Sequence, residues 1–269
     1  MVKKLFKHEI LSYTRNLFPI YLIVLVISAL TRFIYIFESD KTAFGIVSGS
    51  SVVALVVGCV VCLLMTYVYI ITRFYKNLFS NEGYLSFTLP VTPAQHIGVK
   101  LLVGVGLVFC SVLVVLLAIV ISTAGEVTVE LFKSVGYLVN LIKRELVNHF
   151  AFYVIEIAFM IILSIFQSIL LIYTCISIGQ LSRKNRVLAA VGVYFIYYII
   201  VQVFSTIFLV VLSALSATDF YARIMKWISV NQFAFVHIMF CVSIVLSAVL
   251  ILVYYFITHH IIKKKLNLE

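Results

Sequence analysis

Residues 73–100 read RFYKNLFSNEGYLSFTLPVTPAQHIGVK and separate two long apolar runs. A connection that only turned the chain around would need about 4–6 residues, so this loop is predicted to form a surface that another protein contacts. Its end has the pattern of a helix start. Thr92 can cap free backbone N–H groups, Pro93 suits the first helical position, and Gln95 completes a capping box. We therefore predict a helix that runs to about Thr123.

This predicted helix is longer than a membrane requires. At 1.5 Å per residue it reaches on the order of 45 Å, whereas the hydrocarbon layer is ~30 Å thick. We expect its first turns to stand in the cytosol, rigidly joined to the part inside the membrane. A force applied to the loop would then be transmitted through the helix to its part inside the bilayer.

The composition excludes an ordinary soluble domain. The chain is 64% hydrophobic and 11% charged, and it has only three prolines; soluble domains carry about 25% charged residues. Several apolar runs exceed the 18 residues that indicate a membrane-spanning helix. None shows strand alternation, which argues against a β-barrel. These features predict an all-α polytopic membrane protein.

The apolar runs predict six transmembrane helices. They cover residues 17–37, 51–71, 101–123, 150–181, 187–215 and 233–262. Residues 1–16 have apolar side chains at helical spacing and several cations, a pattern typical of an amphipathic elbow helix on the inner membrane surface. Residues 124–149 are predicted to be a partly helical outer segment, which either shapes an exit path or only connects two spans. Residues 218–231 are predicted to be an outer loop that Trp227 anchors among the headgroups.

The distribution of charge predicts the orientation. Six spans place both termini on one side, and the whole formal excess of +10 falls in the four pieces on that side. By the positive-inside rule, both termini are cytosolic. The basic residues then lie beside anionic membrane lipid, which removes nucleic acid as an expected partner. We expect a multi-pass protein of the cell membrane of a bacterium.

The sequence gives no support to an enzyme. It contains no G-x-x-x-x-G-K-[ST] phosphate loop, no H-E-x-x-H and no pair of membrane acids suited to an intramembrane protease. Cys59 and Cys62 form a C-x-x-C without a His or third Cys nearby in the sequence, so we interpret them as packing residues. His259 and His260 are adjacent and point in different directions on a helix, which favours interfacial anchoring. We expect no cofactor, no metal site and no ATPase activity in this chain.

Two ionisable residues lie inside apolar runs, Arg32 and Glu156. Each costs roughly 2.5–3.5 kcal/mol near the bilayer centre if isolated, and less toward the interface. Their depths below the outer surface match to within one helical turn, so we predict that they pair directly or through water. The pair would either stabilise the fold or form a polar element along a substrate path. A single membrane acid also leaves a proton-coupled transporter open.

The chain resembles the type-two ABC exporter permeases, which are six-span subunits that work with a separate cytosolic ATPase. KKLFKHEILSYTRNLFPIYLI (3–23) is similar to the elbow helix that leads into the first span of that family. The loop RFYKNLFSNEGYLSFTLPVTPAQHIGVKLL (73–102) is similar to that of small permeases from Gram-positive bacteria. The order of six spans, with a longer outer segment between the third and fourth, also agrees. The resemblance covers essentially the full length.

The resemblance implies a single permease domain over residues 1–269, paired as a homodimer or with a sister permease above two ABC ATPases. It implies that part of the loop contacts the ATPase and transmits its closure; Tyr84 and Phe87 also offer aromatic anchors of the kind enriched at interfaces. The predicted coupling residues are Phe79, Asn81, Glu82, Gly83, Tyr84 and Phe87.

The chain departs from some members of the family because its outer region after the fifth span is short. No substrate is selected among the antimicrobial peptides, lipids, drugs and polysaccharides that such permeases handle. Two other functions remain open: an ion-coupled secondary transporter, and a non-transporting membrane scaffold or immunity protein.

Overall fold

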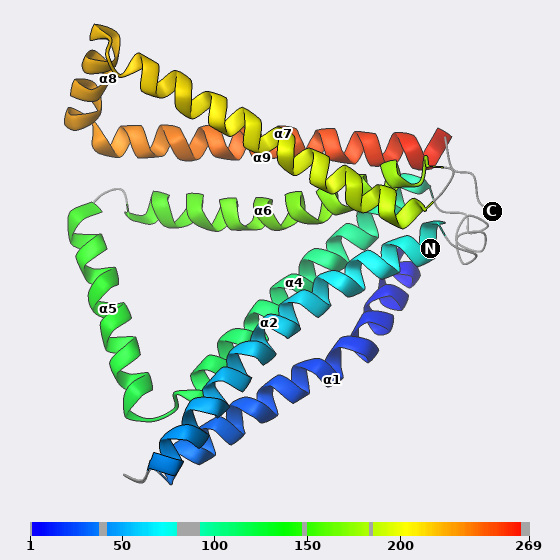
Figure 1. Cartoon of the computed structure of the whole chain (residues 1–269), viewed down its shortest axis with the longest axis vertical. Coiled ribbons are helices and arrows are strands. Elements are labelled where there is room, and N and C mark those ends of the chain that lie inside the picture. The colour runs from blue at the N-terminus through cyan, green and yellow to red at the C-terminus, as the bar shows by residue number, and fades with distance from the viewer. Residues whose placement is uncertain (1, 38–41, 80–91, 147–149, 183–184, 265–269) are drawn as a thin grey trace. The chain divides into compact units, whose positions relative to one another are not determined.

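The computed structural model describes residues 2–37, 42–79, 92–146, 150–182 and 185–264, and within these ranges the regular structure is entirely helical (Figure 1). Six helices are long and apolar enough to cross a membrane. This confirms the prediction of an all-α, multi-pass membrane protein. The helices are α1 (Val2–Ile36), α2 (Thr42–Phe79), α4 (Pro93–Ser122), α5 (Glu126–Leu146), α6 (Phe150–Gly179), α7 (Arg186–Leu215), α8 (Asp219–Val230) and α9 (Gln232–Lys264).

The chain divides into two compact units, residues 1–146 and residues 147–269. In the first unit α1 packs against α2 and α4, and α2 also contacts α4. Figure 1 shows these three helices side by side. Their core holds Val24 of α1, Leu55 and Cys62 of α2, and Ala118 of α4, with Cys59 packed against it. Cys59 and Cys62 are therefore packing residues, as predicted.

Helix α1 is continuous, whereas the sequence predicted an elbow helix over residues 1–16 and a separate span. Its buried residues recur every three, four or seven positions, so one stripe runs along its length: Glu9, Tyr13, Leu17, Val24, Ser28 and Thr31. Pro19 lies near the middle of the helix, and the ribbon of α1 is bent (Figure 1). Proline removes one backbone hydrogen bond and bends a helix without always ending it.

The start of α4 is the capping box that the sequence predicted. The backbone N–H of Gln95 donates to Thr92 Oγ1 at 3.4 Å, and the N–H of Thr92 donates to Gln95 Oε1 at 3.1 Å. Helix α2 extends beyond the predicted residues 51–71 at both ends. Its 38 residues make it about 57 Å long. Residues 73–79, which we assigned to the loop, are instead the last two turns of α2.

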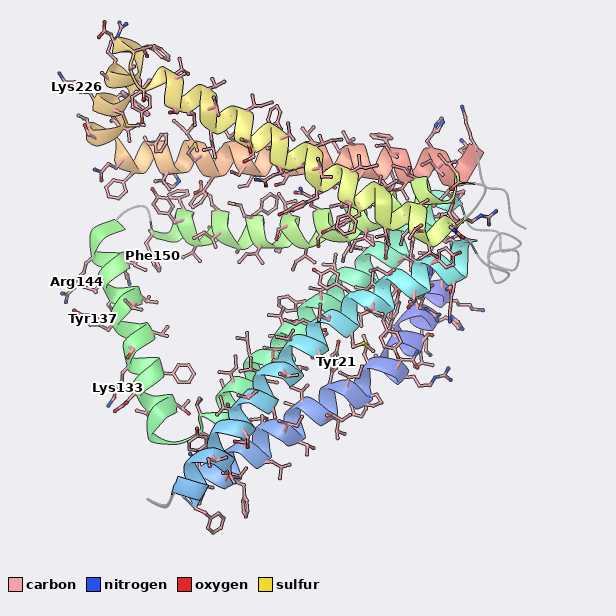
Figure 2. All side chains as sticks on the ribbon, viewed as in Figure 1. Tyr21, Lys133, Tyr137, Arg144, Phe150 and Lys226 are labelled. Carbon is pink, nitrogen blue, oxygen red and sulfur yellow. The ribbon has the colours of Figure 1, made fainter. Side chains whose placement is uncertain are left out.

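Helix α5 covers most of residues 124–149, which the sequence predicted to be a partly helical outer segment. A turn through Gly125, with φ at 121°, connects it to α4, a conformation that glycine adopts without steric cost. Phe132, Val135 and Leu138 are exposed and lie on one side by helical spacing. Lys133, Tyr137 and Arg144 occupy another side and are marked along α5 in Figure 2. The helix is amphipathic, and among the described residues it makes no extensive contact with the other helices of its unit.

The second unit packs α6 against α7 and α9, and α8 contacts α9. The prediction of an outer loop over residues 218–231 was wrong in conformation, because residues 219–230 form α8. Thr218 caps this helix by accepting a hydrogen bond from the Tyr221 N–H at 3.3 Å. Phe220, Ile224 and Trp227 share one side of α8. An amphipathic helix can carry Trp227 to the level of the lipid headgroups as well as a loop can.

The contact between α6 and α7 depends on Gly179. A Cβ atom added there would lie 2.6 Å from the backbone nitrogen of Ala190 and 2.7 Å from its Cα. Such distances force a backbone to move, because a side chain alone cannot relieve them. None of the residues of α7, all of which the structure describes, is buried, so this close approach is a main point of attachment of α7 to its unit.

We predict that Gly179→Ala separates α6 from α7 and destabilises the protein. Overpacking of this kind typically costs 1–3 kcal/mol, so the apparent melting temperature of the detergent-solubilised chain should fall. Gly192→Ala is the matched control, because nothing lies within 4 Å of a Cβ added at Gly192 on α7. Equal melting temperatures for the two variants would contradict the proposed attachment.

Candidate functional site

A buried carboxylate joins the three long helices of the first unit. Glu9 of α1 is 2% exposed. Its Oε2 lies 2.8 Å from Nε of Arg73 on α2, and its Oε1 lies 2.5 Å from Nζ of Lys100 on α4. The side-chain amide of Asn77 donates to Oε1 at 3.2 Å. We call Glu9, Tyr13, Arg73, Asn77 and Lys100 the Glu9 cluster.

The burial of the Glu9 cluster makes its contacts strong. Lys100 is as buried as Glu9, while Arg73 keeps 20% of its side chain exposed. The guanidinium of Arg73 also lies over the ring of the buried Tyr13, 5.4 Å from its centroid, a favourable cation–π arrangement. In a low-dielectric interior, charges attract more strongly, and removing one partner of a buried pair is costly. The cluster therefore holds α1, α2 and α4 together at one level.

Members of the Glu9 cluster lie on both helices that flank residues 80–91, within the loop that the sequence predicts over residues 73–100. Arg73 and Asn77 belong to the last two turns of α2, and Lys100 belongs to the first three turns of α4. Both helices that flank residues 80–91 are thus fastened to α1. Sequence reasoning included Glu9, Arg73 and Lys100 only in the count of charges that predicts the orientation of the chain. The signal it missed is that Glu9 shares a helical face with Tyr13 and Leu17, at spacings of four residues.

A second polar link connects the same three helices deeper in the unit. The Ser111 hydroxyl of α4 lies 2.7 Å from the Tyr21 hydroxyl of α1 and 2.7 Å from the Thr66 hydroxyl of α2; Tyr21 is marked in Figure 2. Thr66 also donates to the Cys62 carbonyl. Hydrogen bonds between hydroxyls on different helices are a common way to join helices in a membrane.

In the second unit, Glu156 of α6 is paired with His237 of α9. The Nδ1 atom of His237 lies 2.9 Å and 3.0 Å from the two carboxylate oxygens. The Tyr153 ring stacks on the imidazole with centroids 4.2 Å apart, and its hydroxyl donates to the Phe233 carbonyl at 3.0 Å. Both members of the pair are partly exposed, at 17% and 22%. Sequence reasoning missed His237, because it compared the depths of formally charged residues only.

The predicted pairing of Arg32 with Glu156 stays a prediction, because the two residues belong to different units. Arg32 lies beside Gly125, where an added Cβ would approach its Nη2 to 2.7 Å.

Of the predicted coupling residues, Phe79 ends α2 and is buried, with its ring centroid 5.8 Å from that of Phe74. The other predicted coupling residues, Asn81, Glu82, Gly83, Tyr84 and Phe87, lie outside the described residues.

Neither metal-ligand geometry nor known relatives add a further assignment. In the part of the chain that the structure describes, no three His, Cys, Asp or Glu side chains gather as a metal site would require. His259, which we interpreted as an interfacial anchor, stacks on Tyr255 with centroids 6.0 Å apart.

No family model, curated protein or solved structure matches the chain.

We predict that Glu9→Gln destabilises the first unit, because it removes the buried carboxylate charge that Arg73 and Lys100 both contact. Breaking a buried pair typically costs 3–5 kcal/mol, which should appear as a lower apparent melting temperature in detergent. Glu130→Gln is the matched control, because Glu130 is exposed on α5.

The double variant Glu9→Gln/Lys100→Gln tests whether these two residues act through each other. It should lose less stability than the sum of the two single variants, because each single change already removes the shared interaction. Additive losses would show that the Glu9–Lys100 contact does not join the helices.

Proposed function

We propose that this chain is the membrane-spanning permease subunit of an ATP-driven exporter, whose ATP is hydrolysed by a separate cytosolic subunit. The observation that carries the proposal is the Glu9 cluster, which fastens both helices flanking residues 80–91 to α1. The resemblance of residues 3–23 and 73–102 to type-two ABC exporter permeases supplies the class of partner.

The lengths of the helices support a role in transmitting force. Helix α2 is about 57 Å long and α4 about 45 Å, both beyond the ~30 Å hydrocarbon layer. With the inner ends cytosolic, as the charge distribution predicts, the excess length stands outside the membrane. The Glu9 cluster stops α1, α2 and α4 from sliding past one another there. A force applied by an ATPase to residues 80–91 then moves the three helices together.

The proposed assembly pairs this permease with a second copy or a sister permease in the cell membrane, above two ABC ATPases. The apolar side chains of α7 favour such an environment. Phe195, Ile199 and Phe204 are among many exposed along the helix, and each needs lipid or another protein to cover it. The coupling surface of the proposal is residues 80–91, with Glu82 and Tyr84 as its leading contacts.

We predict that the tagged chain, expressed with its genomic neighbours and extracted in mild detergent, co-purifies with a phosphate-loop ATPase in near-equal amount. Glu82→Gln/Tyr84→Ala should abolish the co-purification, because it removes a charge and an aromatic anchor from the loop. Glu130→Gln/Tyr137→Ala makes the same two changes on α5 and should leave the complex intact. A stable chain that recruits no ATPase would overturn the exporter proposal.

A second candidate function, an ion-coupled secondary transporter, is favoured by the Glu156–His237 pair. Both groups can exchange a proton, and they lie on two of the helices long enough to span the membrane. Intramembrane ionisable residues often belong to proton relays. The two functions predict different consequences for a variant of Glu156.

For the exporter, Glu156→Gln should reduce stability by about 1–3 kcal/mol, since it weakens the hydrogen bond between the carboxylate and His237 Nδ1. It should leave ATPase co-purification and the ATPase rate of the complex unchanged. The measurements are thermal unfolding, the ATPase rate, and proton flux into dye-loaded vesicles that contain the chain alone. A gradient-driven proton flux that Glu156→Gln abolishes would favour the secondary transporter instead.

A further inference from the structure

An apolar groove runs along the seam between the first turns of α1 and the first turns of α4. Phe6, Ile10 and Leu11 line it from α1, and Val99 and Leu102 line it from α4. It encloses about 380 Å³. All of these side chains except Val99 are exposed, so in water the groove would present a continuous apolar surface.

Two lysines are also part of the lining of this groove. Lys3 and Lys7 both line it, and they are four residues apart on α1, a spacing that places side chains one above the other. Like charges at this spacing repel each other and destabilise a helix. The first turn of α1 also has no acidic residue to complement the positive end of the helix dipole. An anion held between the two lysines would relieve both effects.

We propose that this groove binds an anionic phospholipid, with the headgroup phosphate between Lys3 and Lys7 and an acyl chain against the apolar walls. The arrangement matches both parts of one ligand, a negative charge attached to a long hydrocarbon. Free phosphate would leave the apolar walls uncovered. A zwitterionic lipid would cover the walls but would bring a positive group to the lysines. Because the chain has six candidate membrane spans, lipid is also its nearest abundant neighbour.

The bound lipid would act on the same seam as the Glu9 cluster. Glu9 precedes the groove residue Ile10 in α1, and Lys100 follows the groove residue Val99 in α4. The Glu9–Lys100 ion pair thus fixes the spacing of the two walls, and a lipid that contacts both walls stabilises the same helix pair from the side. Anionic lipid would therefore stabilise the first unit. This effect does not depend on any ATPase, so its test can fail independently of the exporter proposal.

The experiment uses the full chain purified in a neutral detergent. Thermal unfolding and native mass spectrometry are recorded with dioleoyl phosphatidylglycerol, dioleoyl phosphatidylcholine or inorganic phosphate. A lysine near an anionic headgroup contributes about 1 kcal/mol, or about fivefold in affinity. For the two lysines together we expect phosphatidylglycerol to bind about 25-fold more tightly than phosphatidylcholine and to raise the melting temperature, and inorganic phosphate to do neither.

Lys3→Gln/Lys7→Gln should reduce that preference to about twofold or less. Lys263→Gln/Lys264→Gln is the matched control: it removes the same charge from two exposed lysines in the last turn of α9, and should keep the preference. Leu102→Trp, which fills the groove from an exposed position, should weaken the binding of both lipids.

Three results would overturn the proposal. Equal affinity for the two phospholipids would remove the role of the lysines. An equal loss of preference in the two double-lysine variants would show that overall charge attracts the lipid. Stabilisation by inorganic phosphate as large as that by phosphatidylglycerol, or unchanged lipid binding in a folded Leu102→Trp variant, would exclude an acyl chain in the groove.

Discussion

The arrangement of the first unit depends on one buried carboxylate, Glu9, held between Arg73 and Lys100. In lipid, apolar side chains gain little by leaving lipid tails for another helix, so apolar stripes alone set helix positions weakly. A slip of α1 by one turn would still bury apolar groups, but it would separate Glu9 from both cations. The cost of an unpaired charge makes such a slip unfavourable. The ion pairs therefore select one register.

The second unit uses polar contacts in the same way. Glu156 joins α6 to α9 through His237, and farther along the two helices the Thr174 hydroxyl lies 3.1 Å from that of Thr258. Tyr254 of α9 donates to the hydroxyl of Tyr197 on α7 at 2.7 Å. This hydrogen bond and the close approach at Gly179 are two contacts that attach α7 to its unit, although none of its residues is buried.

Sequence predicted the features that have a local cause. The capping box at Thr92 depends on four consecutive residues, and six spans follow from long apolar runs. The ends of α2 and the whole of α8 were missed, because hydropathy reports where a chain is apolar and not where it is helical. The partners of Glu9 and Glu156 were missed for another reason. Each contact joins residues at least 64 positions apart, so only the packing of the helices reveals it.

The two polar links of the first unit together restrict how it can move. One level holds residues 9, 73 and 100, and the other holds residues 21, 66 and 111. Along each helix these levels are about 10–18 Å apart. A helix held at two such points can neither slide nor rotate about its own axis without breaking a buried polar contact. Under the proposed function, a displacement of the helix ends beside residues 80–91 would be passed along α1, α2 and α4 as one body.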